Sequence, residues 1–176
     1  PVRKGFTELI DRDKVLDQFG LPHDKMIVLV MAGARHSQPY IPFREIVNKV
    51  VPLLSDFPNM HFAFLAGADK EYANGLKGFF KERDITNVTV YNYIERIPQL
   101  MEASDMIVAK SGGLATTECL CARLPLILVG KSYGQERANT YTVTKAGAAV
   151  TAETAEELVD RLRQIHENPE QLQTML

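Results

Sequence analysis

The sequence predicts an α/β fold, a Rossmann-like, doubly wound parallel sheet of about six strands with helices on both faces. Two observations carry this prediction. Short runs of aliphatic residues are hydrophobic at successive positions, as strands covered on both faces must be. Between these runs lie segments whose apolar residues recur with helical spacing. Strands that alternate with helices form βαβ units and therefore a mostly parallel sheet.

The composition is that of an ordinary globular domain. The 176 residues are 45% hydrophobic and 24% charged. Twenty basic and 22 acidic side chains give a net charge of −2 without any block of like charge, which argues against a nucleic-acid partner. No apolar run approaches the roughly 20 residues of a membrane-spanning helix, and no signal peptide opens the sequence.

The predicted strands are short and rich in aliphatic residues. They cover Met26–Ala32, His61–Ala66, Val88–Tyr91, Met106–Ala109, Leu126–Val129 and Ala148–Val150.

The first predicted helix covers Asp11–Phe19, and the segment Asp11-Arg12-Asp13 is expected to cap its amino end. Residues 1–10 precede this helix and are expected to be the end of an interdomain linker, so that 11–176 form the domain. Pro52 is expected to bend the end of the second helix. Four apolar stripes mark the other helices: Phe43, Ile46, Val47, Val50 and Leu54; Leu76, Phe79 and Phe80; Ile97, Leu100 and Met101; Leu158, Leu162 and Ile165.

The cysteines, Cys119 and Cys121, are two residues apart in an apolar run. On a helix this spacing points them to different faces, so they cannot bridge each other. The surrounding residues predict two buried, reduced thiols. Reduced thiols in turn favour a cytoplasmic protein.

The topology also predicts where a ligand binds. Six strands with right-handed crossovers most often adopt the order 3-2-1-4-5-6, and ligands bind at the carboxyl ends of strands 1 and 4. Strand 1 is followed by Gly33-Ala34-Arg35-His36-Ser37, and strand 4 by a loop that begins Lys110-Ser111-Gly112-Gly113.

The loop after strand 4 suits a diphosphate. Gly112 and Gly113 let an anion approach the backbone, and the following helix offers free amides from Leu114 to Thr116 at its positive end. Glu118 lies one turn deeper on the same face, where a carboxylate can accept from both hydroxyls of a ribose. The alternative is a plain glycine turn followed by a helix with an incidental glutamate.

The loop after strand 5 opens another helix, in which Gln135, Glu136 and Asn139 share a face. Amides and a carboxylate suit a sugar, whose hydroxyls donate and accept. The alternative is that Gly134 caps the helix, Glu136 complements its dipole and Asn139 is solvated.

Three segments together carry a family resemblance: Ser111-Gly112-Gly113-Leu114-Ala115-Thr116-Thr117-Glu118, then Leu124-Pro125-Leu126-Ile127-Leu128, then Gly134-Gln135-Glu136-x-x-Asn139. Their spacing resembles the donor-binding, carboxyl-terminal half of GT-B glycosyltransferases. The most similar branch contains diacylglycerol glucosyltransferases, monogalactosyldiacylglycerol synthases and the peptidoglycan N-acetylglucosaminyltransferase. The resemblance covers nearly the whole chain.

The resemblance implies UDP-sugar as the donor and assigns the site position by position. Glu118 matches the acid that holds the ribose. The backbone of Ile94 matches the position that reads the uracil edge. The diphosphate loop is matched by Gly112, Gly113, Leu114, Ala115 and Thr116, and Ser111 beside it is also expected to bind substrate. The donor sugar and neighbouring contacts are matched by Gln135, Glu136 and Asn139. The family's first loop, which faces the diphosphate and the acceptor, is matched by Gly33, Ala34 and Arg35.

Two departures from the family pattern stand out. Ala115 replaces a frequent hydroxyl residue, which leaves one phosphate contact to the backbone or to Thr116. The first loop has Arg35 and His36 where the family has glycines. Arg35 is expected to neutralise the departing diphosphate or to mark a changed acceptor, and His36 to be a pH-sensitive contact; a plain surface role is the alternative for both.

Other motifs are incomplete. Gly130-Lys131-Ser132 resembles the end of a phosphate-binding P-loop but lacks its first glycine. The four histidines have no metal-ligand spacing, so neither a metal nor a further cofactor is expected.

The resemblance thus implies the UDP-sugar half of an inverting glycosyltransferase that transfers a hexose to an acceptor hydroxyl, expected to belong to a lipid such as diacylglycerol. It places the general base on an amino-terminal acceptor domain, so these residues alone are expected to bind UDP without transfer. The full-length protein is expected at the cytoplasmic face of the membrane, as a peripheral protein. Alternatives are a UDP-N-acetylglucosamine epimerase, an undecaprenyl-linked N-acetylglucosaminyltransferase, a stand-alone subunit docking on a membrane partner, and a noncatalytic nucleotide-binding module.

Overall fold

The computed structural model describes residues 6, 10–31 and 41–175. Six strands within these residues form one sheet, and every neighbouring pair is parallel. The strands are β1 (Met26–Met31), β2 (Met60–Leu65), β3 (Val88–Tyr91), β4 (Met106–Ala109), β5 (Leu126–Val129) and β6 (Ala149–Ala152).

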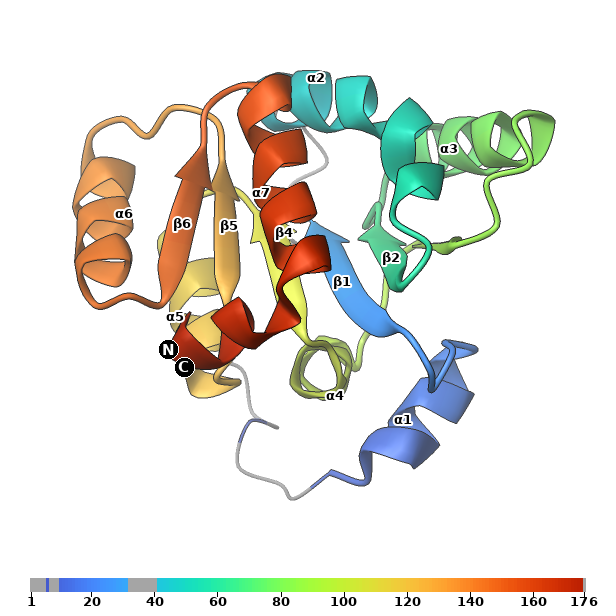
Figure 1. Cartoon of the computed structure of the whole chain (residues 1–176), viewed down its shortest axis with the longest axis horizontal. Coiled ribbons are helices and arrows are strands. Elements are labelled where there is room, and N and C mark those ends of the chain that lie inside the picture. Colours follow the sequence, from blue (N-terminus) through green and yellow to red (C-terminus); the bar gives the residue numbers. More distant parts are fainter. Residues whose placement is uncertain (1–5, 7–9, 32–40, 176) are drawn as a thin grey trace.

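The strand order is β3-β2-β1-β4-β5-β6 (Figure 1), which confirms the predicted topology. From β1 the chain adds β2 and β3 on one side of the sheet and then β4, β5 and β6 on the other. The switch point therefore lies at the carboxyl ends of β1 and β4. The predicted bounds of β3, β4 and β5 are correct to the residue. β6 runs on to Ala152 because Thr151 and Ala152 pair with β5, although Thr151 interrupts the apolar run.

Helices cover both faces of the sheet, as predicted. One face packs against α2, α3 and α7, and the other against α1, α4, α5 and α6. Figure 1 shows α7 in front of the middle of the sheet, with α5 behind the sheet. The helices are α1 (Arg12–Phe19), α2 (Ile41–Val50), α3 (Lys70–Glu82), α4 (Ile97–Ala103), α5 (Gly113–Cys121), α6 (Gln135–Lys145) and α7 (Ala155–Glu167), with 3-10 helices η1 (Val51–Asp56) and η2 (Pro169–Met175).

The four predicted apolar stripes face the sheet. Every residue in them is buried except Ile46 and Phe79, which are partly buried and pack against the same core. Pro52 acts as predicted: α2 ends at Val50 and the chain continues as η1, with Pro52 in its first turn. The stripe continues through η1, because Leu54 is buried.

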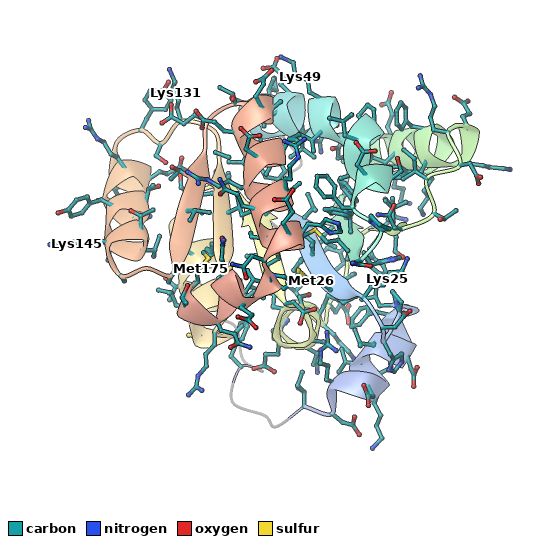
Figure 2. All side chains as sticks on the ribbon, viewed as in Figure 1. Lys25, Met26, Lys49, Lys131, Lys145 and Met175 are labelled. Carbon is teal, nitrogen blue, oxygen red and sulfur yellow. The ribbon has the colours of Figure 1, made fainter. Side chains whose placement is uncertain are left out.

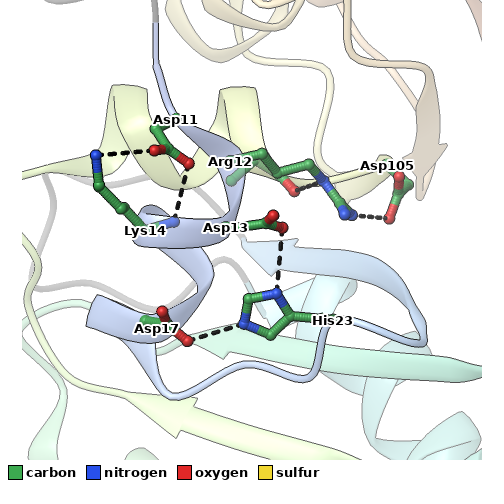
Figure 3. Close-up of polar contacts among 8 residues, drawn as sticks. Asp11, Arg12, Asp13, Lys14, Asp17, His23 and Asp105 are labelled. Carbon is green, nitrogen blue, oxygen red and sulfur yellow. Dashed lines mark hydrogen bonds and ion pairs between the residues drawn. The ribbon is translucent and has the colours of Figure 1, made fainter.

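Helix α1 is fastened to the sheet by its first turn (Figure 3). Asp11 is its N-cap, and the carboxylate accepts the Lys14 amide at 3.3 Å, as predicted. Arg12 donates from Nε to the Ala103 carbonyl at 3.1 Å and from Nη2 to Asp105 at 3.0 Å. The helix is therefore tied to the chain immediately before β4.

The prediction for the cysteines is half wrong. Both are free thiols, but only Cys119 is buried, and Cys121 is exposed. The spacing that keeps them from bridging also sends them to opposite sides of α5, so the helix can bury only one of them.

No helix within the described residues is both long and apolar enough to cross a bilayer.

Candidate functional site

The carboxyl ends of the parallel strands lie along one edge of the sheet, and the candidate site lies there. The described loops at this edge that carry predicted site residues or their partners are residues 92–96 after β3, 110–112 after β4 and 130–134 after β5. The predicted contributions from Gly33, Ala34, Arg35 and His36 fall outside the described residues.

The amino end of α5 is capped by glycine. Gly112 is the N-cap, with extended backbone, and has no side chain to accept from the first amides. The amides of Gly113, Leu114 and Ala115 therefore have no carbonyl partner within the helix. The predicted set is shifted by one residue, because Thr116 donates both its amide and its hydroxyl to the Gly112 carbonyl, each at 2.9 Å.

Helix α6 packs directly against this glycine terminus. A Cβ on Gly113 would stand 3.2 Å from Nδ2 of Asn139, which is tighter than ordinary contact. Asn139 is half-buried there, so it is not the solvated residue of the alternative interpretation. Glycine at 113 lets the two helices meet.

An ion pair joins the same two elements. Nζ of Lys110, the residue after β4, lies 3.1 Å from Oε1 of Glu136 in the first turn of α6. Both side chains are half-buried, with exposed fractions of 27% and 28%. The predicted sugar residue Glu136 thus lies beside the predicted diphosphate loop.

A chain of hydroxyl groups runs parallel to the ion pair. Oγ of Ser111 lies 2.8 Å from Oγ of Ser132, which lies 2.7 Å from Oγ1 of Thr140 in α6. The loop that carries Ser132 is shaped by Gly130 and Gly134, whose φ angles are 86° and 54°. Both are in the left-handed region that favours glycine.

Glu118 is enclosed on the inner side of α5, with 1% of its surface exposed. It lies next to Cys119 in the chain. Burial raises the pKa of the Cys119 thiol to about 12, and the negative charge of Glu118 raises it further in the same direction. Because Glu118 has almost no exposed surface in this structure, its role toward a ribose stays a prediction.

The two other predicted residues lie at the margins. Ile94 is half-buried in the loop between β3 and α4, where it packs against the core that contains α1 and α4. In the sheet, β2 and β1 separate β3 from β4, so the strand that precedes Ile94 is not a neighbour of the switch point. Gln135 is exposed at the first position of α6.

Sequence reasoning missed Lys110, Ser132 and Thr140. A lysine directly after a buried strand and before two glycines was the available signal for Lys110. Ser132 had no such signal, because its partners come from distant positions in the sequence. Lys131, from the incomplete P-loop motif, is exposed and points away from the sheet (Figure 2).

The arrangement favours an anion. Two helix amino ends, those of α5 and α6, meet at this edge, and each is capped by glycine. The unpaired first-turn amides of α5 and the positive dipole ends of both helices attract phosphate groups. In α6 the amides of Glu136 and Arg137 already donate to the carbonyls of Tyr133 and Gly134. Among the described residues, no three histidine, cysteine or acidic side chains gather as a metal site.

Comparison with known proteins agrees with this geometry. Residues 27–176 match the glycosyltransferase family 28 C-terminal domain. The processive diacylglycerol beta-glucosyltransferase of Staphylococcus epidermidis is 29% identical over 175 residues, which are 99% of this chain and 43% of that protein. The chain therefore spans less than half the length of that relative.

Solved structures share the fold. WaaG, a glycosyltransferase involved in lipopolysaccharide biosynthesis, superposes with a TM-score of 0.72 at 16% identity, over 99% of this chain and 48% of WaaG. The UDP-GlcNAc 2-epimerase of Neisseria meningitidis, bound to UDP-GlcNAc, gives 0.69 at 15% identity, over 93% and 42%. The family match over residues 27–176, on a sheet of the predicted order, shows that the chain belongs to the glycosyltransferase family 28 C-terminal domains.

Proposed function

We propose that this chain binds the donor of an inverting glycosyltransferase, a UDP-hexose. The observation that carries the proposal is the glycine-capped amino end of α5 at the switch point, with α6 packed against it. Backbone amides at such a terminus bind phosphate oxygens without a side chain, and the helix dipole favours their charge. Membership of a glycosyltransferase family supports a nucleotide-sugar as the source of that phosphate.

The proposal gives each part of the donor its own residues. The diphosphate binds the amides of Gly113, Leu114 and Ala115, and the ribose hydroxyls bind Glu118. The uracil edge meets the backbone of Ile94. The hexose lies against Gln135, Glu136 and Asn139, at the amino end of α6.

The reaction follows from this placement. An acceptor oxygen attacks the anomeric carbon from the face opposite UDP, a new C–O bond forms, and the bond from that carbon to the β-phosphate oxygen breaks. The electron pair stays on the phosphate, and the acceptor proton passes to a base that the family resemblance places on an amino-terminal domain. The α5 terminus stabilises the departing charge; the loss of one such oriented donor typically costs about 3 kcal/mol of barrier.

For the longer protein we propose a lipid acceptor such as diacylglycerol, reached at the cytoplasmic face of the membrane. The name of the Staphylococcus epidermidis relative supports this acceptor class. Arg35, outside the described residues, remains a candidate for a second cation at the diphosphate.

Calorimetry with UDP tests the proposal, and the most informative substitution is at Glu118, the residue proposed to bind the ribose. Wild-type protein should bind UDP, and Glu118→Gln should bind it roughly 10- to 100-fold more weakly, because hydrogen bonds to a charged group are worth about 1.5–3 kcal/mol. Glu82→Gln, at an exposed position at the end of α3, is the matched control and should bind like the wild type.

A second ligand separates ribose recognition from a loss of folding. Wild-type protein should bind 2′-deoxy-UDP more weakly than UDP, whereas Glu118→Gln should discriminate less between them. Equal affinity of wild type and Glu118→Gln for UDP would remove the ribose assignment. A wild-type protein that does not bind UDP would overturn the proposed function.

A further inference from the structure

Lys110 occupies an unusual electrostatic position. Its Cε lies 3.5 Å from the point where a Cβ on Gly112 would stand, so its side chain passes over the N-cap of α5. Cations are stabilised near the carboxyl ends of helices, because the amino end of the helix dipole is positive. A lysine at this amino end adds to the positive potential that the helix already creates.

The neighbouring helix termini do not remove this potential. The first turn of α5, Gly113–Thr116, has no acidic residue. Helix α6 brings a second positive end to the same edge of the sheet. Its first-turn residue Glu136 pairs with Lys110 at 3.1 Å and offsets part of the charge.

We propose that Lys110 neutralises the leaving diphosphate, and that Glu136 pairs with its ammonium group until the donor binds. This inference rests on the proposed function. When the bond between the anomeric carbon and the β-phosphate oxygen breaks, the electron pair adds one negative charge to UDP. The Lys110 ammonium group, already over the terminus that binds the diphosphate, donates to that oxygen in a charge-assisted hydrogen bond.

Glu136 is suited to give up part of this contact. Its carboxylate lies in the first turn of α6, where the helix dipole stabilises negative charge without Lys110. It is also one of the residues proposed to accept from the hexose hydroxyls. The donor therefore offers a new partner to each member of the pair, a phosphate to Lys110 and a hydroxyl to Glu136.

A purely structural tie between β4 and α6 would behave differently. It would make Lys110 and Glu136 equivalent, since removing either side chain breaks the same contact. Ion pairs with this much exposure contribute little to stability. If Lys110 instead neutralises the diphosphate, removing Lys110 weakens UDP binding and removing the Glu136 charge does not. Uridine binding is then unchanged in both variants, because uridine has no phosphate.

The test is a set of dissociation constants for UDP, UMP and uridine, measured by calorimetry on the whole chain. Lys110→Gln should weaken the binding of UDP roughly 10- to 100-fold, weaken the binding of UMP less, and leave the binding of uridine unchanged. Lys110→Arg should restore UDP binding to within a few-fold of wild type. Lys145→Gln, which removes the same charge at the other end of α6 (Figure 2), is the matched control and should bind UDP like wild type.

Glu136→Gln separates charge from structure if Lys110→Gln folds poorly. This variant should bind UDP at least as tightly as wild type, because it releases Lys110 toward the diphosphate. If Glu136→Gln instead weakens UDP binding as much as Lys110→Gln does, the pair is a structural tie and the inference is overturned. If the wild type binds UDP and Lys110→Gln binds it with the same affinity, the inference is also overturned, while the proposed function stands. Failure of the wild type itself to bind UDP would overturn both.

Discussion

His61, on β2, is a titratable side chain that folding keeps neutral. It is buried, and its Nε2 lies 2.8 Å from Oγ1 of Thr89 on the neighbouring strand. Burial lowers its pKa from 6.5 to about 4, and the positive charge of Lys25 acts in the same direction. The unfolded chain therefore binds a proton between these two pH values that the folded chain does not.

The stability of the protein should fall as the pH falls from about 6.5 toward 4. The unfolded state holds the extra proton in this range, so the free energy of unfolding decreases with falling pH, by at most about 3 kcal/mol from this residue. The measurement is urea unfolding at several pH values for wild type and His61→Gln. The difference between the two should depend on pH within this window and level off above it.

A pH-independent difference would contradict the account. The comparison cancels the other histidines, including His23, whose pKa is raised by hydrogen bonds to Asp17 and Asp13 and which acts in the opposite sense. His61 also shows a limit of sequence reasoning at this scale. Its spacing excluded a metal role, but its burial and its contact with Thr89 depend on the pairing of β2 with β3.

The secondary-structure elements were largely predictable, because most boundaries are set by local chemistry. Asp11 caps α1, Pro52 ends α2, and aliphatic runs define β3, β4 and β5. The errors arise where tertiary pairing overrides local pattern, as in the extension of β6 through Thr151. Contacts between elements, such as those of Asn87, leave no periodic signal.

Asn87 joins three elements and should be sensitive to substitution. Its buried Nδ2 lies 2.8, 3.1 and 3.2 Å from the carbonyl oxygens of Leu54, Phe57 and Met60, at the end of η1 and the start of β2. Asn87→Ala should lower the free energy of unfolding by about 2–4 kcal/mol, because it removes the buried side-chain hydrogen bonds that join these carbonyls to the start of β3. Urea unfolding measures the loss. Asn74→Ala, at an exposed site on α3, should stay within about 0.5 kcal/mol of wild type, and an equally small effect at Asn87 would contradict this role.

At the scale of the whole molecule, the topology predicted the sheet order and the position of the candidate site. A parallel α/β sheet places its ligand at the switch point, and the glycine loop after β4 lies there. Sequence reasoning did not predict how the loops are joined. The Lys110–Glu136 pair and the Ser111–Ser132–Thr140 chain form only when β4, β5 and α6 are brought together.

The central claim is that a UDP-sugar binds at the carboxyl edge, on the amino end of α5. The most direct test is a UDP titration of the ¹⁵N-labelled chain followed by amide chemical shifts. The account predicts saturable shifts at Gly112–Ala115 and at Ile94, with little change along α7 and η2 on the opposite face of the sheet. Shifts confined to α7 and η2, or no shifts with UDP while NAD produces them, would contradict it.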